Sequence, residues 1–319
     1  MKKVLITRSI FPEVVEALSQ RFDVEHNGED RPWAPEELAR RLAGRQGAMA
    51  TVMDRFDEAL LAQAPDLKVI ANIAVGYNNI DVPACSRRGI RVTNTPGVLD
   101  DTTADLTWAL LMSAARRIAE CDAHVRAGQW KIAFGVQSFL GQDIHGATLG
   151  IIGMGRIGQA IARRAQGFDM RVVYHNRSRL PEAEEQRLGA TRVERDELLQ
   201  QADFVVVMAP YSPATHHLIG AAELALMKPT AILVNSARGG VVDDAALVEA
   251  LASGRIAGAG LDVFEGEPRI HPGFARLANV VMTPHIGSAS RATRVVMCNT
   301  AAANMAAVLD GAEPPNPVN

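Results

Sequence analysis

A glycine-rich turn between two regular runs constrains the fold of this 319-residue chain most strongly. The turn, Gly153 to Gly158, reads GMGRIG; an apolar run at 148–152 precedes it and a helical run at 159–166 follows it. In this setting Gly153 permits a tight turn, Gly155 lets the backbone approach a pyrophosphate, and Gly158 lets the helix pack on the strand. The helix N-terminus attracts the anion. The pattern predicts a dinucleotide-binding fold; the alternative is a flexible turn that binds nothing.

Short β-type runs alternate with longer amphipathic runs along nearly the whole chain, as they do in parallel sheets covered by helices. Early strands are predicted at 4–7, 47–52, 67–73 and 91–93, and early helices at 12–21, 35–43 and 57–63. A helix that starts at Asp101 or Thr102 and runs towards Gly128 is predicted to connect two domains. Six later strands are predicted at 147–152, 171–174, 204–208, 231–235, 257–262 and 280–283.

The fold class predicted from this order is α/β with two domains. A Rossmann doubly wound parallel sheet, residues 100–290, is inserted into a flavodoxin-like substrate-binding domain, residues 1–99 and 291–319. The helical stretch 292–309 is expected to return the chain to the first domain. Met53, just after an early strand, is interpreted as core filler rather than as a border of the substrate crevice.

Composition excludes several classes of function. A net charge of −3 provides no basic face for phosphate backbones, so no nucleic acid partner is expected. The most apolar stretch, 106–115, is shorter than the ~20 residues that a membrane-spanning helix needs, and the N-terminus carries no export signal. The three cysteines form no CxxC pair, which argues against disulfides and cysteine zinc sites and favours a cytoplasmic protein. No metal ligands are predicted.

The end of the second strand of the Rossmann series indicates which cofactor is preferred. An NAD-binding fold usually has Asp or Glu there to bind both ribose hydroxyls, whereas this chain has Asn176 and no carboxylate at 174–179. Arg177, Ser178 and, less directly, Arg179 offer charge-assisted hydrogen bonds to a 2′-phosphate. The sequence therefore favours NADP(H), with NAD(H) possible; the alternative is that the arginines form a solvated loop.

Three candidate catalytic side chains follow later strands of this series. Arg238 offers a guanidinium for a carboxylate and an adjacent carbonyl, although a structural ion pair is the alternative. His285 is suited to moving a proton near neutral pH. Glu267 is predicted to hydrogen-bond the imidazole, stabilise its charged form and fix its tautomer, with Glu265 as the rival. The other seven histidines are assigned no chemistry.

Six segments together resemble the D-isomer-specific 2-hydroxyacid dehydrogenase family over essentially the whole chain. Besides the glycine turn they are Val75–Asp81, Thr95–Val98, Ala237–Gly239, Asp262–Pro268 and Pro284–Ser288. Within the family the chain is most similar to glyoxylate/hydroxypyruvate reductases, including those that reduce 2-ketogluconate, which tend to use NADPH. The resemblance implies a homodimer formed through the nucleotide-binding domains. It also implies that Trp130 and Lys131 lie in a loop that approaches the active site, from a partner subunit in some relatives; the alternative is that Trp130 simply packs.

The resemblance also implies roles for individual residues. Arg238, Glu267 and His285 are implied to form a catalytic triad, and the backbone amides of Val75 and Gly76 to receive the substrate carboxylate. Further cofactor contacts are implied at Thr103, Arg156, Ile157, Pro210, Thr215, Ala237, Asp262 and Gly287. The chain departs from the family at Asn176 and Asn78, where relatives carry Asp, and only the first departure bears on cofactor choice.

The expected reaction is hydride transfer from NADPH to the C2 carbonyl of a small 2-oxo acid, with protonation by His285, giving a D-2-hydroxy acid. One alternative is a dinucleotide-sensing scaffold like the corepressors that share this fold. Another is an NAD-linked relative such as phosphoglycerate or phosphite dehydrogenase; the former often has an added regulatory domain, and the latter would need a basic residue at Val75.

Overall fold

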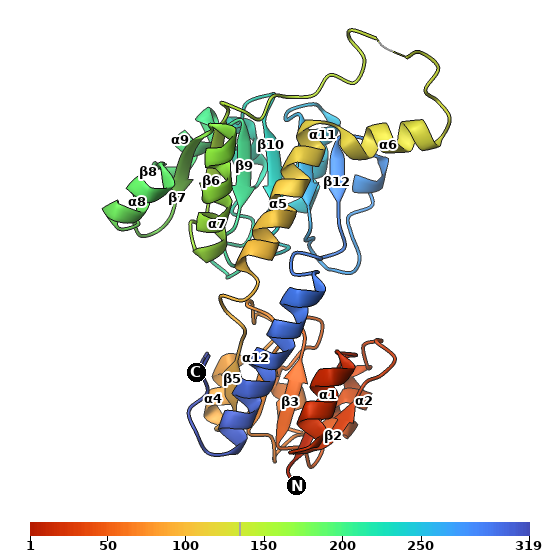
Figure 1. Cartoon of the computed structure of the whole chain (residues 1–319), viewed down its shortest axis with the longest axis vertical. Coiled ribbons are helices and arrows are strands. Elements are labelled where there is room, and N and C mark those ends of the chain that lie inside the picture. The colour runs from red at the N-terminus through yellow and green to blue at the C-terminus, as the bar shows by residue number, and fades with distance from the viewer. Residues whose placement is uncertain (134) are drawn as a thin grey trace. The chain divides into compact units, whose positions relative to one another are not determined.

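The computed structural model describes residues 1–133 and 135–319. The chain divides into two compact units: unit 1 is Met1–Leu99 with Ala289–Asn319, and unit 2 is Asp100–Ser288. These limits lie within two residues of the boundaries predicted from the sequence. Each unit contains a parallel sheet with helices on its faces (Figure 1), so the predicted α/β class, with one doubly wound sheet inserted into another α/β domain, is confirmed.

Unit 1 has a five-stranded parallel sheet in the order β2-β1-β3-β4-β5, which is the flavodoxin-like order. Its strands are β1 Lys3–Ile6, β2 Asp23–His26, β3 Gly47–Ala50, β4 Val69–Asn72 and β5 Arg91–Thr93. The strand β2 was not predicted, because its sequence DVEH lies at the sheet edge and has no apolar run. The central strands β3 and β4 are fully buried, which explains why their apolar sequences were recognised.

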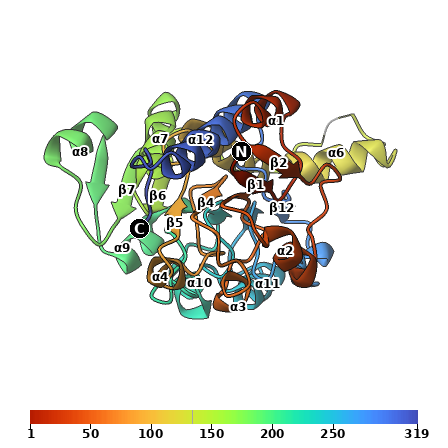
Figure 2. The ribbon, with the colours of Figure 1, turned by 90° about the horizontal axis from the view of Figure 1, so that it is seen from below.

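Helices cover both faces of this sheet. They are α1 Pro12–Ser19, α2 Pro35–Leu42, α3 Glu58–Leu61, α4 Val82–Arg87 and α12 Arg291–Leu309. Alternate residues of β1 enter different cores: Val4 and Ile6 pack with α1 and α12, whereas Leu5 packs with α2, α3 and α4. Figure 2 shows these two groups of helices on opposite sides of the strands. Met53 is 41% exposed, so its interpretation as core filler is wrong.

Unit 2 has a seven-stranded parallel sheet in the order β12-β11-β10-β9-β6-β7-β8. Its strands are β6 Thr148–Ile152, β7 Arg171–His175, β8 Ala190–Arg192, β9 Phe204–Val207, β10 Ile232–Asn235, β11 Gly258–Leu261 and β12 Val280–Met282. The strand order reverses between β6 and β9, so the glycine turn after β6 lies at the switch point where doubly wound sheets bind ligands. Six strands were predicted; the missed one, β8, is a three-residue edge strand.

The sequence predicted only two helical stretches of unit 2, the connector and the run at 159–166, whereas the structure has seven α-helices among the described residues of this unit. They are α5 Asp100–Ala115, α6 Ile118–Arg126, α7 Arg156–Ala165, α8 Glu182–Leu188, α9 Arg195–Gln201, α10 Ala221–Leu226 and α11 Asp244–Ala252. The single connector predicted to run towards Gly128 is two helices, because Arg117 has a left-handed backbone (φ 54°) and pairs with Glu120. Among the described residues, no helix is both long enough and apolar enough to cross a membrane.

Candidate active site

The three predicted catalytic side chains lie in loops at one edge of the unit 2 sheet. Arg238 follows β10, Glu267 follows β11 and His285 follows β12. The last residue pairs of these parallel strands, Asn235 with Leu261 and Leu261 with Met282, are in register. The three loops therefore leave the sheet side by side at its carboxyl edge, where open α/β sheets bind their ligands.

His285 and Glu267 form a direct side-chain pair. The Nδ1 atom of His285 lies 2.7 Å from Oε2 of Glu267, and the other carboxylate oxygen accepts a hydrogen bond of 2.8 Å from the Phe264 amide. Burial by itself raises the pKa of Glu267, but the hydrogen bond and charge of His285, the Phe264 amide and Arg238 together bring that pKa below its ordinary value. Glu267 is therefore held as a carboxylate that fixes Nδ1 and leaves Nε2 available.

The rival carboxylate, Glu265, has a different partner. Both of its oxygens lie 3.2 Å from Nε2 of His217, and its backbone N–H donates to Asp244 at 3.0 Å. The structure thus pairs Glu267, and not Glu265, with His285.

Arg238 is half-buried in this loop cluster. Burial lowers the pKa of its guanidinium, and the charge of Glu267 opposes that shift. Among the described residues, no carboxylate forms an ion pair with Arg238, so the alternative of a structural ion pair finds no partner. A partly desolvated cation without a partner is a ready site for an anionic ligand.

Asp262, at the end of β11, holds the loop that carries His285. Its carboxylate accepts hydrogen bonds from the amides of Ile286 (2.7 Å) and Gly287 (2.8 Å) and from the Thr283 hydroxyl (2.6 Å). Burial raises the pKa of Asp262, and the three donors lower it only in part. This anchoring role was not predicted; the signal available was a buried acid directly after an apolar strand.

The glycine turn has the geometry that a pyrophosphate requires. Gly153 has φ +105°, and a Cβ there would lie 2.5 Å from the Met208 backbone carbon; a Cβ on Gly158 would lie 2.4 Å from the Gly153 carbonyl oxygen. By contrast, a Cβ on Gly155 would meet no atom within 4 Å. No side chain caps α7, which begins with Arg156 and Ile157, so the first amides of this helix are left for another acceptor. The residues present therefore fit a dinucleotide.

At the end of β7, some predicted cofactor residues have partners within the protein and others do not. Asn176 accepts a hydrogen bond of 2.8 Å from the Met154 amide and so braces the turn. Arg179 forms an ion pair with Glu185 at 2.8 Å, so its guanidinium is engaged within the protein rather than left free in a solvated loop. Arg177 and Ser178 are exposed, and within the described part of the chain Arg177 has no ion-pair partner.

The remaining predicted cofactor residues are placed as follows. The Thr215 hydroxyl donates to the Pro210 carbonyl at 2.7 Å, so these two residues close one loop after β9. Ala237 donates to the Asn235 side chain at 3.2 Å. Thr103 is buried in α5 on the side of Gly287, since a Cβ built on that glycine would lie 3.5 Å from the Thr103 hydroxyl.

Val75 and Gly76 belong to unit 1, directly after β4. Two asparagine side chains hold their carbonyls: Asn94 donates to Val75 at 2.9 Å and Asn72 donates to Gly76 at 2.8 Å. Among the described residues nothing accepts from the N–H groups of Val75 and Gly76. The asparagines were not predicted, although a buried polar residue such as Asn72 at the end of an apolar strand is a recognisable signal.

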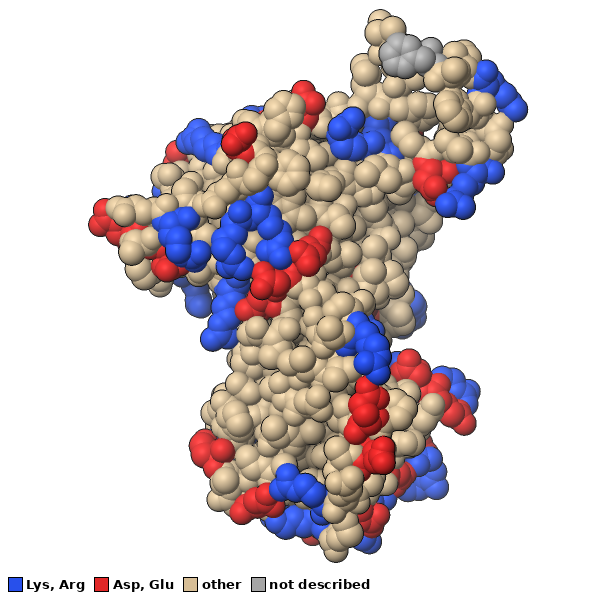
Figure 3. Space-filling model, in the orientation of Figure 1, with Lys and Arg blue, Asp and Glu red and all other residues tan. Residues whose placement is uncertain are grey.

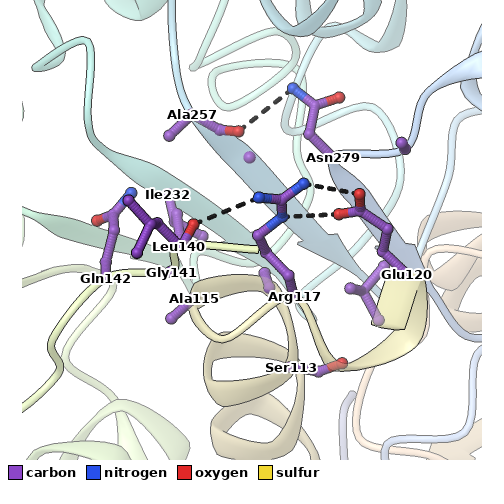
Figure 4. Close-up of a pocket in the computed structure, with 14 residues that line it drawn as sticks. Ser113, Ala115, Arg117, Glu120, Leu140, Gly141, Gln142, Ile232, Ala257 and Asn279 are labelled. Carbon is purple, nitrogen blue, oxygen red and sulfur yellow. Dashed lines mark hydrogen bonds and ion pairs between the residues drawn. The ribbon is translucent and has the colours of Figure 1, made fainter. Parts of the chain in front are cut away.

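A separate cavity of about 310 Å³ lies at the opposite edge of the unit 2 sheet. Ile232, Ala257 and Asn279, at the amino ends of strands, line it together with Leu140 and the Arg117–Glu120 pair (Figure 4). None of the predicted catalytic or cofactor residues lines this cavity, so it belongs to a different part of the surface.

Comparison with known proteins identifies the family. The model of the D-isomer specific 2-hydroxyacid dehydrogenase NAD binding domain matches residues 108–287. The chain is also 49% identical to the glyoxylate reductase of Thermococcus gammatolerans over 320 residues, 99% of this chain and 96% of that protein. The chain belongs to the D-isomer specific 2-hydroxyacid dehydrogenase family. It is therefore an oxidoreductase with a domain for a nicotinamide cofactor.

Solved structures of similar dehydrogenases share the whole fold. An NADPH-dependent glyoxylate/hydroxypyruvate reductase from Sinorhizobium meliloti, in complex with NADP and malonate, has a TM-score of 0.88 at 33% identity, covering 99% of this dehydrogenase and 96% of that chain. A glyoxylate reductase from Paecilomyes thermophila has a TM-score of 0.88 at 34% identity, covering 99% and 98%.

Proposed function

We propose that this dehydrogenase uses NADPH to reduce small 2-oxo acids, namely glyoxylate, hydroxypyruvate and also 2-ketogluconate, to D-2-hydroxy acids. The observation that carries the proposal is the half-buried Arg238 without an ion-pair partner, in the same loop cluster as the His285–Glu267 pair. A 2-oxo acid offers a carboxylate to the cation and a carbonyl oxygen to the proton donor. The 49% identity to a glyoxylate reductase supports this substrate class.

The side chains of the triad divide the work in this proposal. When bound, NADPH supplies the hydride to C2 of the oxo acid. Arg238 binds the substrate carboxylate through its guanidinium fork and polarises the neighbouring carbonyl. His285 gives the proton on Nε2 to the carbonyl oxygen, while Glu267 holds Nδ1 and stabilises the charged imidazole.

The preference for NADPH over NADH is supported by the end of β7. No carboxylate stands at 174–179 to bind a 2′-hydroxyl or to repel a 2′-phosphate. Arg177 is exposed and lacks an ion-pair partner among the described residues, so its guanidinium is available to that phosphate. The amides of the α7 N-terminus and the open space at Gly155 are available to the pyrophosphate.

We also propose that the protein acts as a cytoplasmic homodimer. The helix α6 has no buried residue and extends away from the sheet of unit 2 (Figure 1). The segment after it exposes the side chains of Trp130 (60%) and Ile132 (74%). A second copy of the chain would cover this apolar surface, and sedimentation equilibrium would test whether the protein is a dimer. On the face drawn in Figure 3, basic side chains stand beside acidic ones, which weakens the attraction of this face for a phosphate backbone.

The test is a comparison of initial rates. Loss of absorbance is followed with NADPH and with NADH, with glyoxylate, hydroxypyruvate and 2-ketogluconate offered separately at equal concentration. The proposal expects faster loss of NADPH than of NADH with at least one of these acids. Faster loss of NADH would overturn the cofactor assignment. Tight cofactor binding without turnover of any acid would overturn the reductase and favour a dinucleotide-sensing scaffold.

A further inference from the structure

Two histidines and a carboxylate meet on the surface of unit 2, outside the triad. His216 and Glu265 are exposed and His217 is partly buried, and one ligand atom from each lies within 4.8 Å of those from the other two. The histidines belong to the loop between β9 and α10, and Glu265 to the loop after β11. No role was predicted for either histidine from the sequence, because their proximity to Glu265 depends on the fold.

The distance between His217 and Glu265 matches a shared metal ion. The Nε2 atom of His217 lies 3.2 Å from both carboxylate oxygens. Two ligands of a tetrahedral zinc ion, with bonds of about 2.0–2.1 Å, stand roughly 3.3 Å apart. This pair therefore needs almost no rearrangement to hold an ion of that kind.

The surroundings of the two imidazoles differ. The Nδ1 atom of His217 lies 3.7 Å from Oδ2 of Asp243, which is too long for a hydrogen bond but places a carboxylate near the ring nitrogen that does not face Glu265. Metal-binding histidines usually donate that second N–H to a carboxylate, so a small shift of Asp243 would complete this arrangement. His216 stacks on His217 with ring centroids 3.8 Å apart and has the Tyr211 hydroxyl 3.4 Å from its Nδ1. Because stacked rings do not point their nitrogens at one ion, the exposed His216 ring must rotate out of the stack to bind it.

We propose that His216, His217 and Glu265 bind one divalent transition-metal ion, with Zn²⁺ as the representative. Two imidazole nitrogens and one carboxylate oxygen suit Zn²⁺, Co²⁺ or Ni²⁺, whereas Mg²⁺ and Ca²⁺ prefer oxygen ligands alone. The ring of His216 turns towards the ion, and a water completes a tetrahedral shell. Because only three ligands come from the protein, the site has an open position.

The ion would join two loops that matter to the proposed reaction. The loop with the histidines also contains Pro210 and Thr215, and Glu265 stands two residues before Glu267. The Glu265 amide is itself bonded to the buried Asp244 at 3.0 Å, so this part of the loop is already fixed. Cross-linking the two loops should raise the melting temperature of the protein, because a ligand that binds only the folded state stabilises it.

The test measures Zn²⁺ binding to the full chain without nucleotide, by competition with a chromophoric indicator. Wild type should bind one ion per chain, and millimolar Mg²⁺ should not displace it. His216→Asn and Glu265→Gln should each weaken binding by about tenfold or more. Both residues lie at the surface, so their variants should keep the wild-type circular dichroism spectrum.

Two matched variants identify the site. His145→Asn removes an exposed histidine elsewhere in unit 2, and His285→Asn removes the imidazole of the triad; both should bind Zn²⁺ as wild type does. Co²⁺ should give the strong visible absorption of a tetrahedral complex in wild type but not in His216→Asn. Zn²⁺ affinity that is unchanged in both His216→Asn and Glu265→Gln, or lost in His285→Asn, would overturn the proposal, as would the absence of binding by wild type.

Discussion

The Nδ1 atom of His285 lies 2.7 Å from Oε2 of Glu267, and the second oxygen of Glu267 is held by the Phe264 amide. The backbone of His285 is fixed as well, since its N–H donates to the Asp262 carbonyl at 2.9 Å and its φ is 55°. The imidazole is therefore oriented from both its ring and its main chain. Such preorganisation is what a group that delivers a proton in one direction requires.

The Glu267 carboxylate should stabilise the fold in a pH-dependent way. Its native pKa is lowered, so its contribution is present above the unfolded-state pKa of about 4.3 and is lost as the pH falls through the native pKa. Glu267→Gln should lower the free energy of unfolding by about 1–3 kcal/mol at pH 7. Urea unfolding of both proteins should show that this difference shrinks below about pH 4.3. A difference that grows with acidity would contradict the assignment.

Two glycines of the same turn should separate folding from cofactor binding. Gly153→Ala should destabilise the protein by about 2 kcal/mol or more, because the Cβ would meet backbone atoms at φ +105°. Gly155→Ala should keep the melting temperature nearly unchanged, since no atom lies within 4 Å of its Cβ, but should weaken NADPH binding about tenfold or more. Thermal unfolding and fluorescence titration distinguish the two effects. Wild-type affinity in Gly155→Ala would place the pyrophosphate elsewhere.

Arg177 and Arg179 are a matched pair for the cofactor preference. Arg177→Ala should raise the KM for NADPH by about tenfold or more and leave the KM for NADH unchanged, since a charge-assisted hydrogen bond to the 2′-phosphate is lost. Arg179→Ala should leave the ratio of the two KM values unchanged, because Arg179 is paired with Glu185. Steady-state kinetics of each variant with both cofactors measures the two KM values. An equal change of both KM values in Arg177→Ala would show that Arg177 does not recognise the phosphate.

Much of the fold could be predicted because buried parallel strands leave an apolar signature. The strands β3, β4 and β9 are fully buried and were recognised. The edge strands β2 (DVEH) and β8 (ATR) were missed because each is short and has no apolar run, whereas the edge strand β12 (VVM) has one and was recognised. The break between α5 and α6 was missed for another reason. Arg117 adopts a left-handed backbone conformation, which is rare for arginine, so the sequence gives no sign of the break.

The site residues that could be predicted are likewise those whose role depends on neighbours in the sequence. Gly153 and Gly158 could be predicted because their role depends on neighbours in the chain. Sequence spacing alone allowed either Glu267 or Glu265 to be the partner of His285. The conformation of the loop after β11 decides between them, because it turns Glu267 towards His285 and Glu265 towards His217. Asn72, Asn94 and Asp262 hold functional loops through contacts with segments distant in sequence or with the turn that follows, which the sequence pattern does not encode.

The measurement that tests the account most directly is the turnover of His285→Asn beside His145→Asn. His285→Asn should lower kcat with glyoxylate and NADPH by about 10²–10⁴-fold, because the proton donor is removed. Its NADPH dissociation constant should match that of wild type, since the phosphate-binding turn is untouched. His145→Asn, at an exposed position with no predicted role, should keep wild-type kinetics. Wild-type kcat in His285→Asn would contradict the role of His285 as the proton donor and with it the mechanism proposed for this reductase.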